Sequence, residues 1–115
     1  MNGHTIFTIN DTEYKFVNKP WSTRYSWGHT SALFIDGILT SGANARYYNR
    51  TWESYQYQSC MVMAIDNLIS TLLTDYINEY KEREGIKRLT AERRKPVQAR
   101  FRELNADLYE LKASL

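Results

Sequence analysis

The residues of this sequence best suited to recognition are arginines interleaved with tyrosine and tryptophan. In a strand expected over residues 43–50, side chains alternate between two faces and place one such set on the same side. This set is Arg46, Tyr48, Arg50 and Trp52. Aromatic rings stack on bases and guanidinium groups bind phosphates, so the set fits a nucleic-acid surface. It equally fits a protein-binding hot spot, or a structural role in which Tyr47 lies in the core and the arginines pair with neighbouring carboxylates.

A second aromatic segment precedes this strand. Residues 21–29 hold two tryptophans and a tyrosine, and they include Arg24 and Trp27. We expect this segment to extend whichever surface the strand forms, with Arg24 and Trp27 as binding residues.

A basic segment near the end of the chain is the third candidate. Residues 87–102 contain seven basic residues against the single acid Glu92. Clustered cations attract polyanions or an acidic partner. The residues expected to provide this electrostatic steering are Lys87, Arg88, Arg93, Arg94 and Lys95. The alternative is a solvated turn between two helices.

Catalytic and metal-binding motifs are not found in the sequence. There is no G-x-S-x-G element, phosphate-binding loop or H-E-x-x-H motif, and no His or Cys joins the acids at metal-ligand spacing. Cys60 begins an apolar stretch, which favours a buried hydrophobic residue over a nucleophile. One group could act on a phosphodiester if the fold brought it together, namely His29, Arg24, Tyr25 and Glu53. We therefore expect a non-enzymatic protein without metal or cofactor.

Composition indicates one soluble domain. The chain has 115 residues, with 15 Lys and Arg against 13 Asp and Glu and a net charge of +2, and this length corresponds to one domain. A single cysteine excludes an internal disulfide and fits a reducing compartment. No apolar run reaches the roughly 18–20 residues that span a bilayer, and residues 1–10 do not form a signal sequence. We expect a cytoplasmic protein that binds no membrane.

The apolar periodicity predicts an α+β fold, because it changes from two to 3.6 near Trp52. Strands of an antiparallel sheet are expected at residues 5–9, 13–17, 31–35 and 43–50. Asn10-Asp11-Thr12 and Asp36-Gly37 are the predicted turns. Residues 18–29 contain Pro20 and no clear alternation, so we expect a loop there.

The second half predicts a long helix and then a shorter one. The first begins at Thr51 or Ser54 and ends near Gly85, which suits the left-handed position after a helix. At about 1.5 Å per residue it would be roughly 45 Å long, whereas a compact domain of this size is about 30 Å across. It must therefore break or project. Thr90 is the expected N-cap of the second helix, and Pro96 marks a kink or the true start.

The last helix carries apolar residues at alternating spacings of four and three, which is a coiled-coil seam. These residues are Val97, Phe101, Leu104, Leu108, Leu111 and Leu115. The seam fits a hairpin with the long helix, and because that helix is apolar on more than one face, a homodimer is also predicted. The expected organisation is a single domain with a β-meander at residues 1–52 and a helical hairpin at residues 53–115.

Two strings resemble a family of small proteins of bacteriophages and mobile elements. They are Thr23-Arg24-Tyr25-Ser26-Trp27-Gly28-His29 and the N-R-T-W-E-x-Y-x-Y-Q-S string that begins at Asn49. The resemblance covers about residues 5–65. It implies a counter-defence factor, most concretely an anti-CRISPR inhibitor of a Cas9-type nuclease that acts by stoichiometric binding. The partner would be a host defence nuclease complex in the bacterial cytoplasm, with or without its guide RNA or DNA.

Charge distinguishes the possible modes of such an inhibitor. Cas9-type nucleases hold nucleic acid in positively charged channels, so a near-neutral, locally basic chain is not expected to mimic DNA. The alternative function is a DNA- or RNA-binding accessory or regulatory protein of a phage or mobile element. It would use the same residues directly on nucleic acid.

Overall fold

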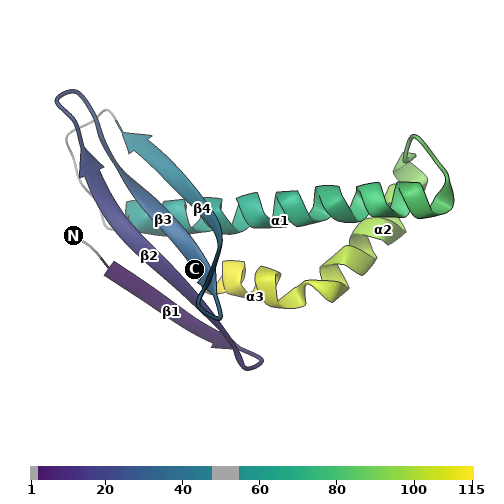
Figure 1. Ribbon diagram of the computed structural model, residues 1–115, viewed down its shortest axis with the longest axis horizontal. Coiled ribbons are helices and arrows are strands. Elements are labelled where there is room, and N and C mark those ends of the chain that lie inside the picture. The colour runs from purple at the N-terminus through teal and green to yellow at the C-terminus, as the bar shows by residue number, and fades with distance from the viewer. Residues whose placement is uncertain (1–2, 48–54) are drawn as a thin grey trace.

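The structure is a computed structural model that describes residues 3–47 and 55–115. Four strands come first, β1 (Gly3–Ile9), β2 (Thr12–Ser22), β3 (Trp27–Ile35) and β4 (Ile38–Tyr47). Three helices follow, α1 (Tyr55–Glu84), α2 (Ala91–Leu104) and α3 (Ala106–Ser114). Figure 1 shows the sheet at one end, α1 projecting from it, and α2 and α3 returning toward it. The predicted α+β fold is confirmed, with the last helix divided in two.

The sheet is an antiparallel meander in the order β1-β2-β3-β4. Its first and last hairpins turn through residues with positive φ, Asn10 (48°) and Asp11 (65°) in one, Asp36 (48°) and Gly37 (82°) in the other. Asn, Asp and Gly adopt this conformation most readily. Asp36 also accepts the Glu13 N–H on Oδ1 at 2.9 Å and donates its own N–H to the Glu13 carbonyl at 2.8 Å. Both predicted turns are confirmed.

The loop predicted over residues 18–29 is wrong for most of its length. β2 and β3 extend through it and leave only residues 23–26 between them. Pro20 suggested a loop because proline cannot donate to a strand ladder. However, β1 pairs with β2 only as far as Asn18, so beyond that point one side of β2 is an edge in the described structure, and an edge tolerates proline.

The long helix α1 is continuous over 30 residues. At its end the N–H of Ile86 donates to the Lys81 carbonyl at 2.9 Å and that of Gly85 to the Glu82 carbonyl at 3.3 Å, with Gly85 at φ 66°. This is the expected Schellman motif. Because the helix does not break, it projects, and the molecule measures 52 × 34 × 21 Å. The predicted start of the helix lies outside the described residues.

By length and composition alone, residues 57–84 of α1 also qualify as a candidate membrane-spanning helix, which differs from the sequence-based expectation. In the structure, Cys60, Ala64 and Ile65 of this helix are completely buried. One such helix is weak evidence of a membrane span, because the core helix of a soluble protein can meet the same criterion, although in α1 only 28% of the apolar window is buried. The burial of Cys60 confirms its interpretation as a core residue.

The hydrophobic core lies between one face of the sheet and the three helices. Its buried members include Tyr14, Phe16, Leu33, Ala64, Ile65, Leu68, Phe101, Leu108 and Leu111. Four residues of the predicted seam are buried within the chain, as the hairpin interpretation requires: Val97, Phe101, Leu108 and Leu111. Dimerisation stays a prediction.

The last helical segment begins as predicted. Thr90 is the N-cap of α2, and its Oγ1 accepts the N–H of Arg93 at 3.4 Å. Pro96 lies inside α2 and does not end it. The predicted start at Pro96 is therefore wrong.

The break in this segment occurs instead at Asn105. Both the backbone N–H and the side-chain Nδ2 of Asn105 donate to the Phe101 carbonyl, at 3.0 and 2.9 Å, which closes the end of α2. Beyond the break, Leu108 is buried, whereas Leu104 just before it is 56% exposed. The seam is therefore interrupted at one of its positions.

The seam offers a matched test of this packing. We expect Phe101→Ala to lower the free energy of unfolding by about 3–5 kcal/mol, because a buried ring is replaced by a cavity. Leu104→Ala should cost less than about 1 kcal/mol, because surface substitutions have small effects. Urea denaturation of both variants checks this. An equally large, concentration-dependent loss at Leu104 would instead show that a second copy covers it.

Candidate binding surface on the outer face of the sheet

One face of the sheet has no described element packed against it. On β2, Tyr14, Phe16 and Asn18 are buried toward the helices, while the alternating residues are partly or fully exposed. We call the opposite face of β2, β3 and β4 the outer face. Its residues are Lys15, Val17, Lys19, Trp21, Gly28, Thr30, Ala32, Phe34, Leu39, Gly42, Asn44 and Arg46.

A tryptophan and an arginine meet at one end of the outer face. Trp21, Gly28 and Arg46 lie opposite one another on three adjacent strands. The guanidinium carbon of Arg46 is 5.4 Å from the centroid of the Trp21 ring, which is a cation–π distance. Trp21 Nε1 donates to Asn44 Oδ1 at 2.8 Å. A Cβ at residue 28 would overlap the indole ring and the Ala45 carbonyl oxygen, so glycine is what allows the ring to lie across β3.

A second cation–aromatic pair lies toward the other end. Lys15 and Phe34 are cross-strand neighbours, and Lys15 Nζ is 5.3 Å from the ring centroid. Between the two pairs, a shallow hollow of about 470 Å³ runs over β3 and β4. Ala32 and Gly42, which pair in the register, form part of its lining. Because Ala32 has a small side chain and Gly42 has none, space is left between the Trp21–Arg46 pair and the Lys15–Phe34 pair.

The charge of the outer face favours anions. Lys15, Lys19 and Arg46 supply three positive charges, and among the described residues of these strands Glu13 is the only carboxylate on the same side. Exposed cations beside aromatic rings attract ligands that combine negative charge with flat or apolar groups. No pair on this face is shielded by a helix.

Two of the predicted surface residues do not join Arg46. Arg24 lies in the connection between β2 and β3, with its guanidinium carbon 5.5 Å from the ring centroid of the 80%-exposed Tyr25. Trp27 lies on the helix side, edge-to-face with the buried His29 at 5.5 Å between ring centroids. The sequence-based expectation of one continuous surface is therefore wrong for Trp27, because its position in β3 points it to the opposite face from Arg46.

Three predicted residues, Tyr48, Arg50 and Trp52, lie outside the described residues. So does Glu53 of the expected acid–base group. The described part of that group is not assembled, because His29 is completely buried while Arg24 and Tyr25 lie in an exposed turn. Within residues 3–47 and 55–115, no cluster of three or more His, Cys, Asp or Glu could hold a metal ion.

The predicted basic cluster lies at the far end of the molecule from the sheet, around the connection between α1 and α2 (Figure 1). All five of its residues are exposed, Lys87, Arg88, Arg93, Arg94 and Lys95. The two ion pairs of the described chain, Arg100–Glu103 at 3.0 Å and Lys112–Asp66 at 2.7 Å, use none of them. The basic cluster and the outer face are thus two separate surfaces.

The sequence-based prediction placed Trp21 only in a loop expected to extend the surface, and it missed Lys15, Lys19 and Phe34. The signal that identifies Trp21, Lys15 and Lys19 is the alternation 15-17-19-21, which continues straight through Pro20. Because the predicted strand ended before Pro20, this alternation was not recognised.

On the opposite side of the sheet, His29 is held in the core. Its ring centroid is 3.9 Å from that of Tyr57, and Cys60 Sγ donates to the His29 carbonyl at 3.5 Å. Burial lowers the pKa of His29 from its ordinary value of 6.5, because the core disfavours the charged imidazolium.

This burial predicts a pH dependence of stability. Below about pH 6.5 the unfolded chain binds a proton at His29 more readily than the folded chain, so the free energy of unfolding should fall as the pH is lowered. Urea denaturation at pH 7.5 and 5.0 measures the loss, and His29→Gln should reduce it. His4→Gln, at an exposed position of β1, serves as the control; an equal reduction in that variant would contradict the assignment.

No family model, curated protein or solved structure matches this chain. The resemblance to small phage and mobile-element proteins therefore stays a prediction. The outer face and the basic cluster are the features of the described chain on which a functional proposal can be built.

Proposed function

We propose that this protein is a non-enzymatic binding protein of a phage or mobile element that counters host defence by binding a nuclease complex, most concretely of the Cas9 type. The outer face is its contact surface. The observation that carries this proposal is the uncovered Trp21–Arg46 pair, held in place by the Asn44 hydrogen bond. Tryptophan and arginine are the residues most enriched in interface hot spots.

The charge of the outer face indicates what kind of partner surface fits it. Three cations against one carboxylate favour an acidic or phosphate-bearing surface, as a nuclease loaded with guide RNA presents. The basic cluster at the far end of the molecule would then act mainly on the rate of association. Its long-range attraction steers a charged partner without requiring a defined contact.

The hot spot can be tested directly. Arg46→Ala and Trp21→Ala should each weaken binding to a Cas9–guide RNA complex by about tenfold or more, because hot-spot truncations cost about 2 kcal/mol or more. Biolayer interferometry on immobilised complex, with a DNA-cleavage assay alongside, measures the effect. Arg100→Ala removes an exposed cation on α2 and should leave affinity unchanged.

Two outcomes would count against the proposal. If the wild-type protein neither binds nor inhibits the loaded or empty nuclease, the counter-defence function is wrong. If it binds but Arg46→Ala has no effect while the variant keeps its unfolding free energy, the outer face is not the contact surface.

A second candidate function is direct binding of single-stranded nucleic acid. It is favoured by the two aromatic rings, Trp21 and Phe34, each beside a cation on one open face. Gly28, opposite Trp21, and Phe34 are six residues apart along β3, which corresponds to about 20 Å of strand. Open aromatic surfaces with adjacent cations are how proteins bind single strands without sequence preference.

Salt dependence separates this candidate from protein binding. For a fluorescent single-stranded 12-mer, the slope of log affinity against log salt should be about −2, since each of three phosphate contacts contributes about 0.7. Arg46→Ala should reduce the slope by about 0.7. Fluorescence anisotropy between 50 and 200 mM NaCl, about the range over which such binding weakens steeply, measures both. If no oligonucleotide binds at the lowest salt, the candidate is rejected.

A further inference from the structure

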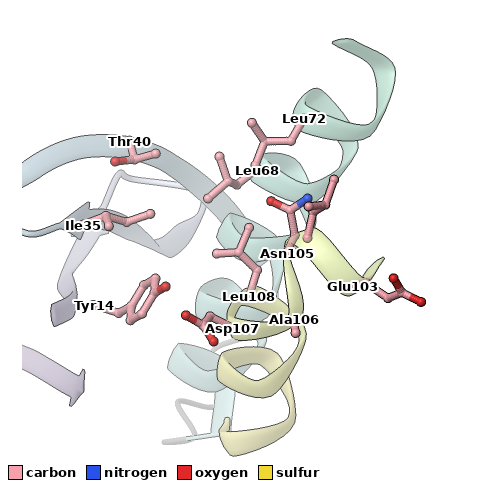
Figure 2. A pocket seen from close by; sticks show the side chains of 11 residues that line it. Tyr14, Ile35, Thr40, Leu68, Leu72, Glu103, Asn105, Ala106, Asp107 and Leu108 are labelled. Carbon is pink, nitrogen blue, oxygen red and sulfur yellow. The ribbon is translucent and has the colours of Figure 1, made fainter. Parts of the chain in front are cut away.

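A pocket of about 370 Å³ opens where α2 and α3 meet, on the helix side of the sheet (Figure 2). Its walls combine apolar and polar side chains, and the apolar ones include Ile35 of β3, Leu68 and Leu72 of α1, and Leu108 of α3. The volume falls within the range of small-molecule sites, about 300–1,000 Å³. Its lining contains none of the residues that define the outer face, and it shares only Thr40 with the hollow over β3 and β4.

The pocket exists because the last helical segment is broken at Asn105. The chain changes direction between α2 and α3 (Figure 1), and residues 103–108, around this change of direction, line the pocket. Asn105 stabilises the break through its two hydrogen bonds to Phe101. Leu104, a rim residue, is left 56% exposed. The break thus coincides with an opening lined by both apolar and polar residues.

Two polar groups lie on one wall of this pocket. Figure 2 shows the Tyr14 phenol and the Asp107 carboxylate side by side at the cavity, whereas Glu103 points away from it. Asp107 Oδ1 accepts from Asn10 Nδ2 at 2.7 Å, which fixes the orientation of the carboxylate. Asp107 is also in the first turn of α3, where the helix dipole stabilises its negative charge.

The lining of the pocket includes two carboxylates, Asp107 and Glu103, of which Glu103 pairs with Arg100 at 3.0 Å. None of its eleven lining residues is Lys, Arg or His. Burial, followed by the carboxylates of Asp107 and Asp36, raises the pKa of Tyr14, so the phenol stays protonated. Tyr14 can accept a hydrogen bond on its oxygen, and Asp107 retains Oδ2 as an acceptor. Both groups therefore match a cationic donor.

We propose that this pocket binds a small organic ammonium ion. The ammonium group donates to the Asp107 carboxylate and the Tyr14 oxygen, and the carbon chain lies against Leu68, Leu72 and Leu108. Charge-assisted hydrogen bonds to a partly buried carboxylate are about twice as strong as neutral ones. The pocket therefore distinguishes a cation from a neutral or anionic molecule of the same shape.

The test uses n-hexylammonium as the probe, with 1-hexanol and hexanoate as the neutral and anionic matches. Two-dimensional NMR of the full chain should show saturable shifts confined to the pocket residues, with hexylammonium binding at least about tenfold more tightly than either control. Tighter binding of 1-hexanol or hexanoate, or shifts spread over the surface, would overturn the proposal.

Substitutions test whether the Asp107 carboxylate is the charge that binds the ammonium group. Asp107→Asn keeps an acceptor for Asn10 and should weaken hexylammonium binding about tenfold. Asp75→Asn, at an exposed position of α1, should leave binding unchanged. Leu104→Lys places a cation at the exposed rim, so it should also weaken binding while leaving the fold intact. Equal affinity in wild type and both pocket variants would refute the site.

The site is independent of the proposed function on the outer face. Trp21→Ala should leave hexylammonium binding unchanged, and Asp107→Asn should leave binding to a nuclease or an oligonucleotide unchanged. A result in which both activities fall together in either variant would contradict two separate sites.

Discussion

The arrangement of this protein depends on one helix, α1, which packs one of its faces against one face of a four-stranded sheet. Small residues bring the two close: Ser41 Oγ donates to the Ala64 carbonyl at 2.8 Å, and Asn67 Nδ2 donates to the Gly42 carbonyl at 3.0 Å. With α1 fixed on this side, α2 and α3 complete the core from the same side. The other face of the sheet is then left open, and it provides the outer face on which the proposed function depends.

Polar side chains in the core fix the strand register on which the outer face depends. Asn18 and Ser31 are cross-strand partners, and Ser31 Oγ donates to Asn18 Oδ1 at 2.7 Å while Asn18 Nδ2 contacts Met61 Sδ at 3.5 Å. If the pairing of β2 with β3 shifted by one residue, the buried and exposed faces of the strand would be exchanged. The Asn18 and Ser31 side chains would then lose their hydrogen bond. The same register places Trp21 opposite Gly28. The polar contacts in the core therefore also determine how the residues of the outer face are arranged.

Much of the fold could be predicted from local chemistry, because turns and helix ends are local. Asp36-Gly37, Gly85 and Thr90 all act as expected. The long-range features could not be predicted in this way: Pro20 lies beyond Asn18, the last residue of β2 that pairs with a described residue of β1, and no residue signals the break at Asn105 within a regular apolar seam. For the site, Arg46 was predicted from its residue type, whereas its partner Trp21 required knowing that β2 continues past the proline.

The separation of the two positive surfaces limits the kind of partner that can use both. The outer face and the basic cluster lie at opposite ends of a molecule 52 Å long, whereas exposed charges are screened over about 8 Å at physiological ionic strength. The basic cluster therefore adds little to the affinity of a small ligand on the outer face. A partner that gains from both must extend along the whole molecule, as a large nuclease complex or a long nucleic acid does.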